Sequence, residues 1–241
     1  MKTAPYIKNR IKKFPKGYVF TYKDFKPKVN NSEAIIKALN RLVTSGKIER
    51  LSKGKYYKPK TTVFGTLDPE QTQVVKDLLQ KNGEVIGYLT GASIYNALGL
   101  TTQIPNTIQI GKNDVRPAFT RGRYTISFIK QKNIITRENI FLLQILDVLR
   151  NIKKIPDARI KLVCKKMLER IKNLSSEDQR KLVRLAKKYP PYTRALLGSI
   201  LETIGNRELV GSLRLTLNPI STYNLPQVNE ALSIAESWSI K

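Results

Sequence analysis

The stretch NSEAIIKALNRLVTSGKIERLSKGKYYKP, residues Asn31–Pro59, constrains the fold of this chain more than any other segment. Ser32 is expected to cap a helix, because its hydroxyl can accept a hydrogen bond from an unpaired amide of the first turn. Apolar residues then recur at the i, i+3, i+4 and i+7 spacing of an amphipathic helix: Ile35, Ala38, Leu39 and Leu42. Gly46 is expected to end this helix, since glycine enters the left-handed region at no steric cost.

Two short strands are predicted after the helix, at Ile48–Leu51 and Tyr56–Lys58, joined by the turn Ser52-Lys53-Gly54-Lys55. Upstream, the sequence predicts a helix over Thr3–Phe14, a brief strand at Tyr18–Phe20 and a short second helix capped by Thr21. A polar, cationic helix next to a lysine-tipped β-turn is typical of a winged helix-turn-helix. We therefore expect this motif over residues 1–60.

Charge is concentrated in the same part of the chain. Lys and Arg number 44 against 18 Asp and Glu, which gives a net charge of +26. Residues 1–60 hold 17 basic and three acidic residues, so more than half of the net charge lies in the first quarter. Because such an excess repels itself unless it meets a polyanion, nucleic acid is the expected partner.

The sequence does not favour a membrane or an exported protein. No run approaches the roughly 18 apolar residues of a membrane-spanning helix, and Met1–Pro15 has no apolar core of a signal peptide. The only cysteine, Cys164, rules out an internal disulfide and suits a reducing compartment. It lies on a predicted apolar helix face, so a buried, inert thiol is expected. We expect a cytoplasmic protein with no membrane partner.

Histidine is absent from the chain, which argues against most enzyme classes. A Ser-His-Asp or Cys-His arrangement is impossible, and so is a zinc site built on histidine. The acidic residues are scattered, and no glycine-rich phosphate loop appears. We expect no enzyme activity, no metal and no cofactor. A metal-dependent nuclease is the enzyme alternative that carboxylates alone leave open.

The predicted helix supplies the candidate DNA-binding residues. The major groove of B-DNA admits one α-helix, whose exposed N-terminal residues face the base edges. The candidates for base edges are Ser32, Glu33, Ile36, Lys37 and Asn40. Arg41, Thr44 and the lysines of the first helix are expected on phosphates, and Lys53, Gly54 and Lys55 form the wing. The alternative is that these charges are only a solvated face.

The remainder of the chain is expected to form one C-terminal domain, residues 61–241. Lys60–Thr66 is predicted to be a linker and Leu67–Gln80 a helix. Strands are predicted at Glu84–Leu89, Thr107–Gly111 and Tyr124–Ile129, followed by helices from Glu138 onwards. The fold class is therefore α+β: an N-terminal winged helix-turn-helix, then a domain that is mixed α/β to about residue 150 and mostly helical after it.

Two predicted helices of this domain, Arg159–Lys172 and Ser176–Lys188, carry basic outer faces. Between residues 150 and 188 there are 14 basic and four acidic residues. A second basic surface for phosphates or an acidic partner is one reading, and a solvated helical pair is the other. Its candidate residues are Lys161, Lys165, Lys166, Arg170, Arg180, Lys181, Arg184, Lys187 and Lys188.

Four blocks together resemble the AbiEi family of antitoxins: ALNRLVTSGKIERLSKGKYYKP, GYLTGASIYNALGLTTQIPNTIQI, YPPYTRALLGSILETIG and LNPISTYNLP. The resemblance implies a type IV toxin-antitoxin system of bacterial abortive infection. It implies that a winged helix binds inverted repeats upstream of its own operon and represses it. It also implies that the C-terminal domain counters a nucleotidyltransferase toxin without a stable complex. Arg194 and the Asn218-Pro219 turn are candidates for the antitoxin surface, although a helix-start contact and a structural turn explain them equally well.

A second class of function stays open at this point. The chain can also be a plain winged-helix transcription regulator whose C-terminal domain senses a ligand or dimerises. A neighbouring nucleotidyltransferase gene would favour the antitoxin, and its absence would favour the plain regulator.

Overall fold

The computed structural model describes residues 3–63 and 65–241 and divides the chain into two compact units. The first unit comprises the described residues up to Gln80 together with Phe119–Thr125. The second comprises Lys81–Ala118 and Ile126–Lys241. The boundary predicted after residue 60 therefore falls inside the first unit. Met1 and Lys2 of the predicted domain, and Phe64 of the predicted linker, lie outside the described residues.

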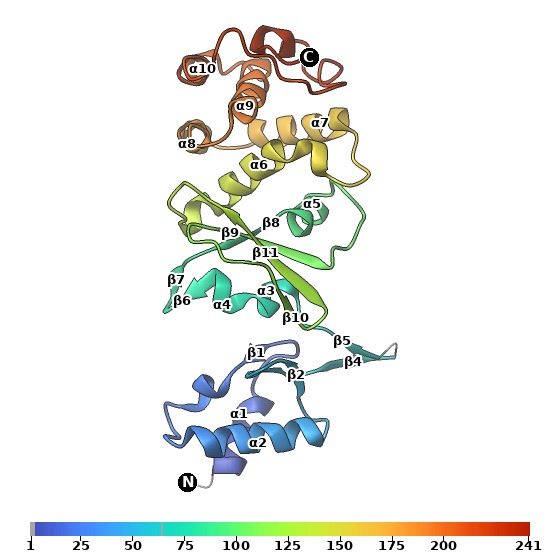
Figure 1. Cartoon of the computed structure of the whole chain (residues 1–241), viewed down its shortest axis with the longest axis vertical. Helices are drawn as coiled ribbons and strands as arrows, with labels where there is room; N and C mark the ends of the chain where they lie inside the picture. Colours follow the sequence, from blue (N-terminus) through green and yellow to red (C-terminus); the bar gives the residue numbers. More distant parts are fainter. Residues whose placement is uncertain (1–2, 64) are drawn as a thin grey trace. The chain divides into compact units, whose positions relative to one another are not determined.

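The first unit begins with three helical segments and a small sheet (Figure 1). They are α1 (Thr3–Lys12), β1 (Val19–Phe20), the 3-10 helix η1 (Tyr22–Phe25), α2 (Ser32–Thr44), β2 (Glu49–Ser52) and β3 (Lys55–Tyr57). The strands are antiparallel in the order β1-β3-β2. One apolar core joins these elements, because Ile7 of α1, Phe20 of β1, Phe25 of η1 and Ile35 of α2 are all buried in it.

Residues 60–80 differ from the prediction. Instead of a linker, β4 (Lys60–Thr62) and β5 (Gly65–Leu67) form a hairpin. Leu67 pairs with Lys60 in this hairpin, so Leu67 cannot begin a helix. The predicted helix is replaced by two single turns, α3 (Gln71–Val74) and α4 (Lys76–Leu79), which are separated at Val75. The predicted start at Leu67 was wrong because the strand pairing overrides the local helix pattern there, whereas the two helical turns over residues 71–79 lie within the predicted range.

The second unit combines a sheet with a bundle of helices. Its strands are β8 (Tyr88–Thr90), β9 (Thr107–Lys112) and β11 (Tyr124–Lys130), in a sheet of order β10-β11-β9-β8. The strand β10 (Phe119–Arg121) and the first residues of β11 belong to the first unit. A further small ladder joins β6 (Gln80–Lys81) to β7 (Glu84–Val85). The described chain is therefore mixed α+β, as expected.

In the second unit α8 and α9 pack against α6, most of whose residues are buried, while α7, α10 and η4 pack against α9. The bounds of the helical segments are α5 (Ala92–Ala97), η2 (Arg137–Asn139), α6 (Ile140–Arg150), η3 (Ile152–Lys154), α7 (Ile160–Lys172), α8 (Ser176–Ala186), α9 (Pro191–Thr203), α10 (Arg207–Arg214) and η4 (Ala235–Trp238). The end of the chain folds back on α9, where Trp238 covers Gly198 so closely that a Cβ atom there would overlap the indole ring. Cys164 is fully buried on α7, and burial raises the pKa of its thiol to about 12.

Asp147 of α6 is a charged residue in the middle of this apolar core, with 1% of its surface exposed. Its carboxylate accepts hydrogen bonds from the hydroxyls of Tyr88 at 2.7 Å, Thr90 at 2.8 Å and Tyr189 at 2.9 Å. Burial raises the pKa of Asp147 and outweighs these donors, which lower it. The three donors join β8 and Tyr189, in the segment between α8 and α9, to α6.

Among the described residues, no helix has both the length and the apolar character that crossing a membrane requires.

Candidate nucleic-acid interface

The helix α2 carries most of the predicted site, and its position is fixed from both ends. Asn31, not Ser32, is the N-cap: its Oδ1 accepts a hydrogen bond from the amide of Ala34 at 3.0 Å. Ser32 is instead the first helical residue and is half-buried. The prediction of Ser32 as the cap was wrong because Asn31 and Ser32 are adjacent and both have side chains that can cap a helix. Gly46 follows the helix with φ 66°, as predicted.

One face of α2 is open to solvent, opposite the buried residues Ile35, Ala38 and Leu39. The exposed residues are Glu33, Ile36, Lys37, Asn40, Arg41 and Thr44. Ile36 is an apolar side chain with 39% of its surface exposed on this face. Such a side chain suits contact with a thymine methyl group, while Lys37 and Arg41 supply positive charge. The Thr44 hydroxyl donates to the Asn40 carbonyl at 3.2 Å, so it is engaged within its own helix.

Asn40 is part of a brace between α2 and the sheet. Its Oδ1 accepts one hydrogen bond from Arg50 Nη2 at 2.7 Å and another from the Tyr56 hydroxyl at 3.2 Å. The Arg50 guanidinium also lies over the Tyr56 ring, 5.7 Å from its centroid. Reading an adenine needs both the oxygen and the nitrogen of an asparagine amide. Because the oxygen already accepts two bonds, Asn40 positions Arg50 rather than reading a base in this arrangement.

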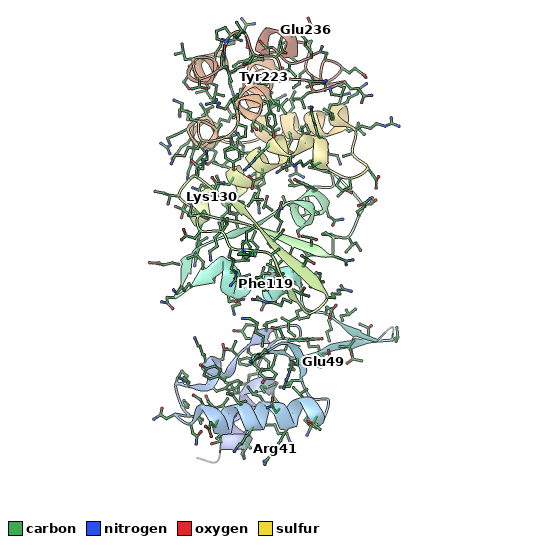
Figure 2. The ribbon with its side chains drawn as sticks, viewed as in Figure 1. Arg41, Glu49, Phe119, Lys130, Tyr223 and Glu236 are labelled. Carbon is green, nitrogen blue, oxygen red and sulfur yellow. The ribbon has the colours of Figure 1, made fainter. Side chains whose placement is uncertain are left out.

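A groove of about 550 Å³ runs between α1 and α2. Four basic side chains line it: Lys8 and Lys12 of α1, Arg41 of α2 and Lys47 after α2. The structure therefore brings Arg41 together with the first-helix lysines that were predicted to contact phosphates. Figure 2 shows Arg41 on the far side of α2 from the strand that carries Glu49.

The tip of the β2–β3 hairpin differs from the prediction at one of its three residues. Lys53 and Gly54 form the exposed turn, and Gly54 has φ 74°, a conformation that favours glycine. Lys55, predicted to be a wing contact, points elsewhere: its Nζ lies 3.0 Å from Asp77 Oδ2, and 18% of its side chain is exposed. The wing prediction was wrong for Lys55 because an acidic partner 22 residues away fixes its side chain.

Asp77 is the centre of a charge cluster in the first unit. Its other oxygen accepts a hydrogen bond from Arg121 Nη1 at 2.6 Å, and the Arg121 side chain is 6% exposed. Burial by itself would raise the pKa of Asp77, but the hydrogen bonds and charges of Arg121 and Lys55 outweigh it, so the pKa is lowered. The cluster ties the tip of the β2–β3 hairpin to α4 and β10.

Arg50 is the main residue of this surface that sequence reasoning missed. Strict alternation along a strand would place Arg50 on the same side as the buried Ile48. Within β2, however, Arg50 is exposed next to the buried Leu51, and the pairing register shifts only after Arg50, between Arg50 and Ser52. The sequence did contain a signal for this role of Arg50, namely a cationic residue in a short strand next to a turn. Lys58 was not assigned a role either, and it donates to two carbonyls at the end of α1.

The nine residues of the predicted second basic surface lie on two helices and the turn that follows the second. Four belong to α7 and five to α8 or the turn after it, and each helix packs against α9 (Figure 1). Lys166 and Arg170 donate to the carbonyls of Gly99 and Leu98 after α5, and Lys161 pairs with Glu230 at 2.7 Å. The remaining residues are Lys165, Arg180, Lys181, Arg184, Lys187 and Lys188; all are exposed except Lys181, which is half-buried.

Arg194 and Asn218 lie in different surroundings. Arg194 is half-buried near the start of α9 and donates to the Lys187 carbonyl at 3.5 Å. Asn218 is exposed beyond α10, where its Oδ1 accepts a hydrogen bond from the Ile220 amide at 3.1 Å. These contacts agree with the structural alternatives, a contact at a helix start and a local turn.

Comparisons place the chain among related proteins without giving it a function. No curated protein matches the sequence. The crystal structure of the RV2827C protein from Mycobacterium tuberculosis is similar in fold, with a TM-score of 0.54 and 13% sequence identity. The match covers 90% of this chain and 82% of that one. Residues 6–182 match a family described as a family of unknown function, DUF6088, and the chain therefore belongs to DUF6088.

Proposed function

We propose that the chain is a DNA-binding repressor whose N-terminal elements, α1 to β3, act as a winged helix-turn-helix. The observation that carries this proposal is the outer face of α2, which is exposed, cationic and adjacent to the braced guanidinium of Arg50. The order of the elements and the sheet order β1-β3-β2 are those expected for the motif.

In this proposal α2 enters the major groove, where Ile36, Lys37 and Arg50 approach base edges. Arg50 takes the place that we first expected for Asn40, because Asn40 holds Arg50 in position. The phosphates on either side are contacted by Lys8, Lys12 and Arg41 in the groove between α1 and α2. Lys53 and Gly54 at the hairpin tip lie along the backbone or the minor groove.

The resemblance to AbiEi antitoxins supports a second part of the proposal. The target is then an inverted repeat upstream of the protein's own operon, and binding represses that operon. The C-terminal unit counters a nucleotidyltransferase toxin without forming a stable complex, in the cytoplasm and without catalysis by this chain. The other candidate is a plain regulator with a ligand-sensing C-terminal unit, which a pocket lined by Lys130, Lys132, Arg150 and Lys188 favours.

Footprinting of the region upstream of the gene tests the DNA-binding proposal. We expect the protein to protect a short inverted repeat. This protection should persist when random-sequence duplex is added in excess as a competitor. Protection that disappears equally with specific and random competitor would contradict a sequence-specific repressor. Co-expression with a neighbouring nucleotidyltransferase tests the antitoxin part separately, because toxicity that persists despite folded protein would contradict it.

A further inference from the structure

The second unit contains a basic pocket of about 340 Å³, which we call the Arg150 pocket. It lies where β11 ends, α6 ends and α9 begins. Its lining residues are Lys130, Gln131, Lys132, Arg150, Lys188, Tyr189, Pro190 and Pro191. Half of these residues are cationic, and none of the described residues that line the pocket is acidic. The DNA-binding proposal leaves this cluster unused.

The wall of the pocket is rigid because two of its residues belong to the buried polar network. Gln131 donates to the hydroxyls of Tyr88 and Tyr189, each at 2.8 Å. Tyr189 donates in turn to Asp147 at 2.9 Å. The Gln131 carbonyl oxygen accepts from the Asn133 amide at 2.8 Å, so both ends of the Gln131 side chain are held. Lys130 and Lys132 flank a fixed residue and are exposed.

Four cations around one hollow repel each other unless an anion occupies it. Lys188 has a carbonyl contact, to Lys132 at 3.3 Å, which does not neutralise its charge. Pro190 and Pro191 begin α9, a helix of 13 residues, so the partial positive charge of its N-terminus adds to the same field. Multiple cations at the start of a helix suit a ligand with several negative charges, such as a chain of phosphates.

A second pocket, of about 370 Å³, shares Arg150 with the first. Tyr192, Tyr223, Asn151 and Asn224 line it, and Lys153 and Lys154 add two more cations to its lining. The Tyr223 hydroxyl is buried and has no hydrogen-bond partner among the described residues. Because a buried hydroxyl without a partner is unfavourable, this atom suits a polar group of a ligand. Aromatic rings with nearby amides are the surroundings in which proteins hold a nucleobase.

We propose that the two pockets together bind a nucleoside polyphosphate. The Arg150 pocket holds the phosphate chain through Lys130, Lys132, Arg150 and Lys188. The neighbouring pocket receives the base, with the Tyr223 hydroxyl on its polar edge. Figure 2 labels one residue of each pocket, Lys130 and Tyr223. The combined volume lies in the range of small-ligand sites.

Calorimetric titration of the full chain with ATP, inorganic triphosphate and adenosine tests the proposal. We expect ATP to bind, triphosphate to bind more weakly and adenosine to show no binding. The double substitution Lys130→Gln and Lys132→Gln is expected to weaken ATP and triphosphate by about 10- to 100-fold, because it removes two charge-assisted contacts. Tyr223→Phe is expected to weaken ATP but not triphosphate, since it changes only the base pocket.

Lys172→Gln is the matched control, because Lys172 is an exposed lysine on α7 that lines neither pocket. Absence of ATP binding, or equal losses in the control, would overturn the proposal. Tighter binding of a single-stranded RNA 12-mer than of ATP, with the same sensitivity to Lys130 and Lys132, would also overturn it in favour of a nucleic-acid surface. Affinity for the upstream duplex is expected to stay unchanged in all variants, so failure here is distinguishable from failure of the repressor proposal.

Discussion

Arg50 is the single side chain whose orientation matters most for the proposed interface. Free arginine side chains lose considerable rotamer entropy when they bind, whereas Arg50 is already held by Asn40 and by the Tyr56 ring. A guanidinium held in this way can present its remaining donors to a guanine edge or to a phosphate. Asn40 therefore contributes to the proposed DNA contact by holding the Arg50 side chain in position.

The hairpin tip offers a matched pair of substitutions. Lys53→Ala is expected to weaken binding to all duplex sequences and to lower the salt slope by about 0.9, the value for one phosphate contact. Lys55→Ala is expected to leave the DNA affinity nearly unchanged, because Lys55 is paired with Asp77. Anisotropy titrations at several salt concentrations measure both effects. A larger loss for Lys55→Ala than for Lys53→Ala would contradict the assignment.

The lowered pKa of Asp77 predicts a pH dependence of stability. The ordinary value is 3.8, and the folded pKa lies below it. The charge cluster therefore stabilises the fold at pH values above 3.8, and this contribution is lost as the pH falls through the folded pKa. Asp77→Asn is expected to lower the urea midpoint at neutral pH, because it leaves the buried Arg121 without its counter-charge. Urea unfolding of both proteins measures the difference.

Repeating the urea unfolding of both proteins at lower pH supplies an internal control. As the pH falls through the lowered folded pKa of Asp77, the wild-type carboxyl is protonated, so the two proteins are expected to converge. A difference that stays constant from neutral to acidic pH would mean that Asp77 acts through packing and not through charge.

Some features of these residues were not predictable from the sequence. The outward face of α2 follows from a local period of 3.6, and its exposed members were predicted. The pairing of Lys55 with Asp77 and Arg121 depends on contacts between distant segments of the chain. The hold on the Arg50 side chain depends on its contacts with Asn40 and the Tyr56 ring, which its own strand pattern does not reveal.

The N-terminal cap of α2 can be tested by substitution at two neighbouring residues, Asn31 and Ser32. Asn31→Ala is expected to lower the free energy of unfolding by about 1 kcal/mol, because it removes the acceptor for the Ala34 amide. Ser32→Ala, at the neighbouring position, is expected to change it by less than about 0.5 kcal/mol. Chemical denaturation of the two variants separates them. The reverse order would restore Ser32 as the cap.

Elements defined by local patterns were predicted better than elements defined by pairing. The helix α8 begins at Ser176 as predicted, and Ser175 caps it by accepting a hydrogen bond from the Asp178 amide at 3.1 Å. The β4–β5 hairpin was not predicted, because its short strands carry no alternating apolar face. Likewise, basic residues on α7 and α8 look like one surface in sequence, whereas Lys166 and Arg170 satisfy carbonyls that follow α5.

At the scale of the whole molecule, DNA binding and the antitoxin role are proposed for different units. The full chain with Arg50→Ala and Lys53→Ala is therefore expected to lose repression and to retain neutralisation of the toxin. A promoter fusion and a growth assay with the co-expressed toxin measure the two outcomes. Loss of neutralisation by the variant at normal protein level would contradict this separation.

The central claim is that the outer face of α2 inserts into duplex DNA. The most direct measurement is the affinity of the full chain for the upstream duplex when Lys37 and Arg41 are both replaced by Glu, beside a control with Lys165→Glu and Lys172→Glu on α7. The account predicts that the α2 variant loses affinity by about 100-fold or more and that the control changes little. Only the α2 variant reverses charge on the helix face that enters the major groove of the DNA. Equal affinities of the two variants would contradict it.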